Sequence, residues 1–317
     1  MRYETVRASG LLFIADPHLA DTPPGQRLPG YREQILHKVE LCLARARELD
    51  LCPVLLGDLF HWPRDNSNQL LVALIDLLRP QRPFALVGNH DKYQARLTSD
   101  VSLAVLQAAG VLRLLDEPGP QFVLETPSGR ALVGASPDGA RLPARFDRDP
   151  DTPDTVLWLT HHNLRFPDFL EGTHRLREIP GVDLVVNGHI HRPQPTVTTG
   201  ATTWVNPGNI TRLTFSRHSL ERIPAAHLWR PGMAQPERWD IPHLPFYEVF
   251  PDQPFPTDEA APDAPSRFLQ GLERLAWRRT HEGIGLKQFL QDNLNPDAPE
   301  HDLIWELYEE VTRDDRT

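Results

Sequence analysis

The stretch "LVGNHDKY", residues 86–93, ends an apolar run with polar side chains that can bind a metal ion, accept a proton or shape a turn. The run that contains its first residues, "FALVG" (84–88), has the length and composition of a buried strand. Asn89, His90 and Asp91 therefore follow directly on a predicted strand. Because open α/β sheets bind their ligands beyond the carboxyl ends of the strands, this stretch predicts a functional site.

Four other predicted strands end in the same manner. They are followed by Asp16-Pro17-His18, by Gly57-Asp58, by His161-His162 and by Gly188-His189-Ile190-His191. Five strands thus deliver Asp, Asn or His to one edge of a sheet. We interpret this convergence as a shared metal centre.

The residue types at these strand ends suit a pair of divalent ions. Mixed carboxylate, imidazole and amide ligands are accepted by Mn²⁺, Fe²⁺ and Zn²⁺. Two such ions about 3.5 to 4 Å apart need one carboxylate to bridge them and can activate a water molecule between them. In "LTHHN" (159–163) either His161 or His162 is the ligand, since adjacent strand residues point to opposite faces.

The wider pattern predicts a layered α/β fold, because short apolar segments alternate with segments of helical period. Further strands are expected at 10–15, 53–57, 130–135, 155–160, 183–188 and 202–206, and helices at 31–50, 68–79 and 101–110. One face of the helix over 31–50 is apolar and consists of Ile35, Val39, Cys42, Leu43 and Ala46. A Pro- and Asp-rich linker over 251–265 divides a domain of residues 1–250 from a helical C-terminal extension of residues 266–317.

The composition is that of a soluble globular protein, with 40% hydrophobic and 24% charged residues in a chain of 317. A net charge of -10 argues against a protein that coats nucleic acid by bulk electrostatics, although it allows a local basic surface. No run approaches ~20 apolar residues and the N-terminus lacks a signal-peptide core, so we expect a cytoplasmic protein without a membrane segment. Cys42 and Cys52 fit neither a metal-binding nor a disulfide pattern and are expected to be buried thiols.

Taken in order, the five strand-end motifs resemble those of the calcineurin-like metallophosphoesterases. The resemblance covers about residues 10–215 and includes the turn "NPGN" at 206–209. It implies a layered β-sandwich flanked by helices and two bound ions, for which Mn²⁺ is expected and Fe²⁺ or Zn²⁺ are alternatives. It further implies one ion held by Asp16, His18, Asp58 and His191, and a second held by Asp58, Asn89, His161 and His189.

The resemblance also implies that a metal-bound hydroxide attacks the phosphorus, while His90 stands near the phosphate without binding metal. There His90 stabilises charge or protonates the leaving oxygen, a role for which an imidazole has a suitable pKa. For Asp91 two interpretations stay open. It either orients His90 or caps the turn, or else it caps the amino end of a helix.

The stretch "GDLFHWPRDNSNQLLVALIDLLR" (57–79) most resembles the SbcD-type DNA repair exonucleases. That likeness implies that His61 contributes to phosphodiester cleavage. A basic rim that includes Arg64, Arg192 and Arg212 would grip the neighbouring phosphates. The expected function is therefore a DNA exonuclease or endonuclease of repair, with a small-molecule phosphodiesterase or phosphatase as the alternative and a non-catalytic binding scaffold as a third class.

The extension of residues 266–317 is a poor candidate for a DNA-binding arm, because it holds 7 Lys plus Arg against 11 Asp plus Glu. Its segment "HDLIWELYEEV" (301–311) has one apolar helical face, which docks either on the protein's own core or on a partner. The SbcD likeness implies an SMC-like ATPase as that partner. The sequence leaves open the strand polarity of cleavage, the native metal and whether the chain forms a homodimer.

Overall fold

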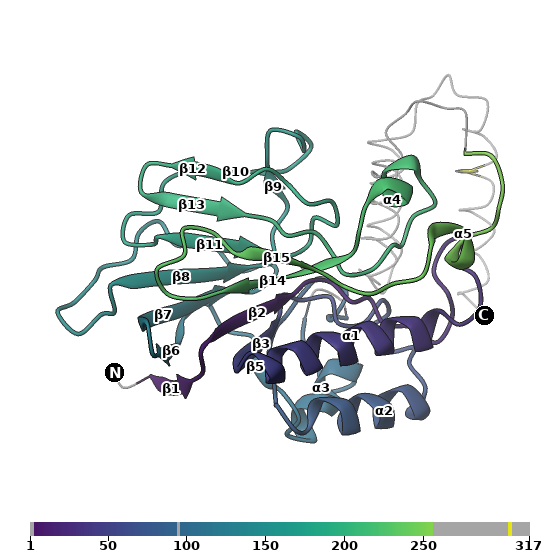
Figure 1. Ribbon diagram of the computed structural model, residues 1–317, viewed down its shortest axis with the longest axis horizontal. Coiled ribbons are helices and arrows are strands. Elements are labelled where there is room, and N and C mark those ends of the chain that lie inside the picture. The colour runs from purple at the N-terminus through teal and green to yellow at the C-terminus, as the bar shows by residue number, and fades with distance from the viewer. Residues whose placement is uncertain (1–2, 94–95, 256–303, 306–317) are drawn as a thin grey trace. The chain divides into compact units, whose positions relative to one another are not determined.

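The computed structural model describes residues 3–93, 96–255 and 304–305. Two β-sheets pack face to face (Figure 1). The first has seven strands in the order β1 (Glu4–Arg7), β6 (Gly119–Thr126), β7 (Gly129–Ser136), β8 (Thr155–Thr160), β11 (Leu184–Asn187), β13 (Thr202–Val205) and β12 (Val197–Thr199). The second has six strands in the order β15 (Glu237–Asp240), β14 (Ala225–Trp229), β2 (Gly10–Ile14), β3 (Leu51–Leu55), β4 (Phe84–Leu86) and β5 (Arg113–Leu115). Strands β9 (Leu164–Arg165) and β10 (His174–Arg175) form a separate parallel pair.

Three helices cover the outer face of the six-stranded sheet: α1 (Tyr31–Glu48), α2 (Asn68–Leu78) and α3 (Ser102–Ala108). Helix α2 begins after Ser67, whose hydroxyl accepts a hydrogen bond from the Leu70 amide at 3.2 Å. Gly110, the last residue of the third predicted helix, adopts a left-handed φ of 67°, as expected of a residue that ends a helix. Two short helices, α4 (Arg217–Glu221) and α5 (Phe246–Val249), follow later in the chain.

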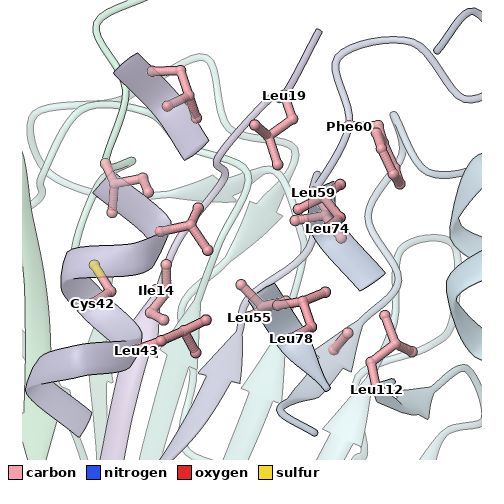
Figure 2. Close-up of a cluster of buried hydrophobic side chains, with 14 of the residues drawn as sticks. Ile14, Leu19, Cys42, Leu43, Leu55, Leu59, Phe60, Leu74, Leu78 and Leu112 are labelled. Carbon is pink, nitrogen blue, oxygen red and sulfur yellow. The ribbon is translucent and has the colours of Figure 1, made fainter. Parts of the chain in front are cut away.

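Hydrophobic side chains fill the space on both sides of the six-stranded sheet. In β2, Leu11 and Phe13 face the other sheet, whereas Leu12 and Ile14 face the helices. Figure 2 shows the helix-side cluster, in which Ile14 lies beside Cys42 and Leu43 of α1 and Leu55 lies beside Leu78 of α2. A sheet covered on both faces needs strands that are apolar throughout, which is why these strands are continuous apolar runs in the sequence.

The expected fold class is confirmed, and so are the predicted strands and helices within the described residues. All five residues of the predicted apolar face of α1 are buried, and both cysteines are buried and unpaired. The sequence patterns missed the hairpin of β14 and β15. The reason is that β15, "ERWD", lies at a sheet edge with mostly exposed side chains and carries no apolar period.

The predicted linker begins with residues that pack on the preceding domain. The Phe255 ring stacks on Phe215 with 4.8 Å between centroids, in a small cluster with Phe246 and Phe250. The remainder of the linker and nearly all of the extension of residues 266–317 lie outside the described residues. The expected partner contact of that extension therefore stays a prediction. Among the residues that the structure describes, no helix has the length and hydrophobicity needed to cross a membrane.

Candidate metal centre

The seven predicted metal ligands all lie in turns that follow parallel strands. Strands β2, β3 and β4 run parallel to one another in one sheet, and so do β8 and β11 in the other, so within each sheet their carboxyl ends point the same way. The structure brings six of the seven together as two overlapping groups, within which the ligand atoms lie no more than 4.8 Å apart. The groups are Asp16, His18, Asp58 and His191, and Asp58, His161 and His189.

In the first group, ring nitrogens and carboxylate oxygens converge on one point. The Nε2 atoms of His18 and His191 are 2.9 Å apart, and Asp58 Oδ2 is 3.6 Å from His18 Nε2. Asp16 Oδ2 is buried and has no hydrogen-bond partner among the described residues. Buried lone pairs that face one another in this way are costly unless a cation or a proton lies between them.

In the second group, Asp58 Oδ2 lies 3.3 Å from His161 Nε2, so the same oxygen borders both groups. Asn89 Oδ1 is 3.2 Å from His161 Nε2 and 2.8 Å from His189 Nδ1. His161 Nδ1 donates to the Leu56 carbonyl at 2.7 Å, which fixes the tautomer that leaves Nε2 for a metal. These residues fit a pair of divalent ions that share Asp58.

The choice between the two adjacent histidines follows from their hydrogen bonds. His162 Nε2 donates to the Ala140 carbonyl at 2.7 Å, and its ring packs edge-on against His174. His161, not His162, therefore lies among the candidate ligands.

Several of these ligands have a strained backbone. Asp16, His18, Asp58 and His189 have φ values of 46°, 50°, 48° and 71°, in the left-handed region. Only two other non-glycine residues in the described part of the chain have positive φ, so the strain is concentrated at the site. Each such residue costs about 1 to 3 kcal/mol. Gly88 permits the close approach of this backbone, because a Cβ there would overlap the Asp58 carboxylate.

Burial keeps most of the ligand imidazoles neutral. Desolvation lowers the pKa of His191 to about 3 and that of His189 to about 4, and it lowers the pKa of His18 well below its usual value. Only a neutral imidazole can bind a metal ion. The site is therefore ready for metal at neutral pH without the loss of protons from these three rings.

His161 behaves in the opposite way. Burial alone lowers its pKa, but the negative charges of Asp58 and Asp16 outweigh desolvation and raise that pKa to about 10. In the metal-free protein a protonated His161 thus balances the buried carboxylate of Asp58. A metal ion that binds at this point must displace the proton.

We therefore expect metal loading at pH 7 to release about one proton from His161, together with a fraction of a proton from Asp16, whose pKa is raised to about 7 by burial. Calorimetric titration of the metal-free protein with Mn²⁺, in buffers that differ in ionisation enthalpy, measures this number. His162→Asn is the matched control, because its ring lies outside the ligand groups, and it should release as many protons as the wild type. A binding heat that does not depend on the buffer would contradict the proposed charge state of His161.

The two predicted catalytic imidazoles lie beside the first group, and with His18 they form a further cluster whose ring nitrogens lie within 4.8 Å of one another. His90 Nδ1 donates to the His61 carbonyl at 2.8 Å, since a carbonyl can only accept, and this leaves Nε2 for proton exchange. The His61 and His90 rings stack with 5.4 Å between centroids, and His18 lies within 5.5 Å of both. Burial, with the charge of His90, lowers the pKa of His61 to about 3. His61 is therefore neutral and suited to hydrogen bonding rather than to proton donation.

The three arginines predicted to bind substrate differ in their surroundings. Arg192 is exposed and directly follows a candidate ligand. Arg64 pairs with Asp100 at 3.2 Å and lies over the Tyr93 ring. Arg212 is only 5% exposed and donates to backbone carbonyls of residues 222 and 244. The structure does not support a substrate contact by Arg212, because its guanidinium is used inside the protein.

Of the roles considered for Asp91, the structure shows the cap of its own turn. Its carboxylate accepts hydrogen bonds from the Gly88 amide at 2.9 Å and the Phe60 amide at 3.3 Å, and the next helix, α3, begins only at Ser102. Asp91 therefore fastens the turn after β3 to the turn after β4. Its contribution is to hold the two ligand-bearing turns together.

Sequence reasoning missed a buried amide network beneath the ligands. Asn187 Oδ1 accepts from the Thr160 hydroxyl at 2.8 Å and from the His162 amide at 2.9 Å, and its Nδ2 donates to Asn206 Oδ1 at 2.9 Å. The network joins the ends of β8, β11 and β13. A polar residue inside the apolar run "DLVVNG" was the only local signal of it.

The match to one protein-family model agrees with the geometry of the site. The model of the family described as calcineurin-like phosphoesterase matches residues 10–193. No curated protein matches the sequence. One similar solved structure is a 5'-nucleotidase precursor from Thermus thermophilus, with 15% identity and a TM-score of 0.39 over 69% of this chain and 50% of that one. A second is NAD nucleotidase from Haemophilus influenzae, with 12% identity and a TM-score of 0.40 over 74% of this chain and 51% of that one. A third is a dimetal phosphatase from Danio rerio, with 13% identity and a TM-score of 0.39 over 71% of this chain and 94% of that one. The chain spans about half the length of the two nucleotidases.

Proposed function

Because the chain belongs to the calcineurin-like phosphoesterase family, we propose that it is a metal-dependent phosphodiesterase that cleaves DNA, as an exonuclease or endonuclease of repair. The observation that best supports DNA as the substrate is the position of His61. Its ring stacks on His90 at the rim of the ligand groups, in the segment most like that of repair nucleases. A small-molecule phosphodiesterase or phosphatase is the alternative that the experiment below separates.

Two divalent ions, for which we propose Mn²⁺, would be held by the two ligand groups and would supply positive charge to the phosphoryl oxygens and acidity to water. His90 delivers a proton from Nε2 to the leaving oxygen while its Nδ1 stays bonded to the His61 carbonyl. The His90 amide also donates to Asp58 Oδ1 at 2.8 Å, so the proton donor and the shared ligand are fixed to one another.

A nuclease must also bind the nucleotides on either side of the cleaved bond. Arg192 is exposed next to the first ligand group, where it can pair with a phosphate. Trp62 is 39% exposed and packs edge-on against His61 at 4.6 Å between centroids, so a base can stack on its indole. Arg64 would exchange Asp100 for a phosphate when DNA binds.

The test compares His61→Ala with the wild type on linear, circular and hairpin DNA, on cyclic nucleotides and on bis-p-nitrophenyl phosphate, all with Mn²⁺. We expect DNA cleavage to fall by about 10²-fold, because misplacement of the reacting group by ~1 Å has a cost of that size. Hydrolysis of the small diester should change far less, and metal content should stay the same. His37→Ala, an exposed imidazole on α1, is the control and should behave as the wild type.

Equal losses on DNA and on bis-p-nitrophenyl phosphate would contradict a nuclease role for His61. A wild-type protein that hydrolyses the small diester or a cyclic nucleotide but leaves every DNA intact would favour the small-molecule enzyme instead.

A further inference from the structure

The loop of residues 206–212, here called the NPGN loop, is held by cationic side chains along its backbone. Four consecutive carbonyl oxygens each accept a hydrogen bond from a buried or half-buried cation. The pairs are Arg222 to Asn209 (2.7 Å), Lys38 to Ile210 (3.0 Å), Arg222 to Thr211 (2.6 Å) and Arg27 to Arg212 (2.6 Å). Buried basic side chains are costly unless they are hydrogen-bonded. Here two arginines and Lys38, whose pKa is lowered well below its usual value by burial, all bind the same short segment.

Arg222 binds more of these acceptors than the other two cations. Besides two loop carbonyls, its guanidinium contacts the side-chain oxygen of Asn209 and donates to the backbone carbonyl of His191 at 3.1 Å. One planar group therefore connects the NPGN loop to the backbone of a candidate metal ligand. A lysine at this position could not make the same contacts, because its single ammonium group is too compact to reach all the acceptors that the planar guanidinium binds.

The NPGN loop in turn holds the first ligand motif. The Ile210 amide donates to the Ala15 carbonyl at 2.9 Å, and the Thr211 hydroxyl donates to the Pro17 carbonyl at 2.8 Å. These two acceptors flank Asp16 and precede His18. On the other side, the Asn209 amide donates to the His191 carbonyl at 3.0 Å.

The loop thus spans the two segments that carry Asp16, His18 and His191, which are ligands of the first group and not of the second. The ligands special to the second group are Asn89, His161 and His189. The Asn89 and His161 side chains bond one another, Leu56 and His189 rather than the loop. The loop reaches the segment of His189 through Asn206, whose Nδ2 donates to the Ile190 carbonyl at 2.8 Å, whereas the bonds of Arg222 go to residues 191, 209 and 211. The effect of Arg222 should therefore fall on one subsite of the pair.

We propose that Arg222 is a positioning residue for the first metal subsite and sets its affinity through the NPGN loop. This inference rests on the proposed dinuclear centre. Residues that orient metal ligands from behind change metal affinity by about 10- to 100-fold when they are replaced. Arg222→Met should lower the affinity for one of the two ions by that factor and leave the affinity for the other at the wild-type value.

The experiment titrates metal-free protein with Mn²⁺ and follows binding by equilibrium dialysis and by electron paramagnetic resonance. With two equivalents, the wild type should give the signal of a coupled pair of ions. Arg222→Met and Arg222→Lys should instead keep the six-line signal of a single bound ion until excess Mn²⁺ is added. Thr211→Val, which removes only the bond to Pro17, should lower the Mn²⁺ affinity of the same subsite by a smaller factor.

Arg148→Met is the matched control. Arg148 also donates to two backbone carbonyls, those of Asp154 and Gly181, but in loops that carry no candidate ligand, so this variant should bind both ions as the wild type does. The proposal would be overturned if both Arg222 variants bound Mn²⁺ as the wild type does. It would also be overturned if the affinity for both ions fell by the same factor.

If Arg222→Met does not fold, Thr211→Val decides the question, and its wild-type binding of both ions would overturn the proposal. A wild type that binds fewer than two ions would overturn the metal centre itself, which is a distinct result.

Discussion

Asp58→Ala is expected to empty the metal centre and to lower phosphodiester hydrolysis by about 10³-fold or more, since metal ions supply several kcal/mol of transition-state stabilisation. Asp58 is the residue common to both ligand groups, and its Oδ2 lies 3.6 Å from His18 Nε2 and 3.3 Å from His161 Nε2. Without it, each ion loses a ligand and the pair loses its bridge. Metal analysis after dialysis, together with bis-p-nitrophenyl phosphate kinetics, measures both effects.

Asp58→Asn separates the loss of the ligand from the loss of the fold. An amide oxygen can still accept the His90 amide hydrogen bond now made to Asp58 Oδ1, so the turn should stay in place. A neutral amide is nevertheless a weak bridge between two cations. Retention of both ions by Asp58→Ala would show that another group bridges them.

His90→Asn is expected to keep both ions and to lose about 10² to 10⁴ in rate, the usual contribution of general acid-base catalysis. The ring touches the first group without being needed to complete either four-residue ligand set. The loss should depend on the leaving group. p-Nitrophenolate departs readily without a proton, whereas the alkoxide of a nucleotide does not, so DNA cleavage should fall more than hydrolysis of the nitrophenyl diester.

His174→Asn is the control for this substitution, because that ring is exposed on β10 and packs against His162 outside the ligand groups. Metal analysis is the deciding measurement. If His90→Asn lost one ion, His90 would be a ligand, and the assignment of the proton to its Nε2 would be wrong.

The positions of the candidate ligands were predictable because each follows an apolar strand closely in the sequence. Parallel strands then bring such residues together whatever lies between them, so a local pattern is enough to place Asp58 or His191 at the site. The inward direction of Arg212 was not predictable. Its acceptors belong to residues 222 and 244, and nothing near Arg212 in the sequence indicates them.

The same reason explains why Arg222 escaped sequence reasoning. It lies 31 residues after His191, in a segment without a metal motif, and its part in the site depends on how the chain returns from α4 to the sheet. The cap that Asp91 forms on its own turn was predictable, but its bond to the turn after β3 was not, for a related reason. A carboxylate after a strand can accept from any nearby amide, and the amide of Phe60 comes close only in the folded protein.

The left-handed backbone at Asp16, His18, Asp58 and His189 bears on how this protein can be engineered. Glycine adopts that conformation without strain. A substitution to glycine at any of these positions would therefore relieve backbone strain, but it would also delete a candidate ligand. Rounds of laboratory evolution scored only for heat resistance would therefore gather inactivating glycines at the centre of the protein. A library built on this scaffold has to be selected for turnover and for thermal tolerance in the same screen.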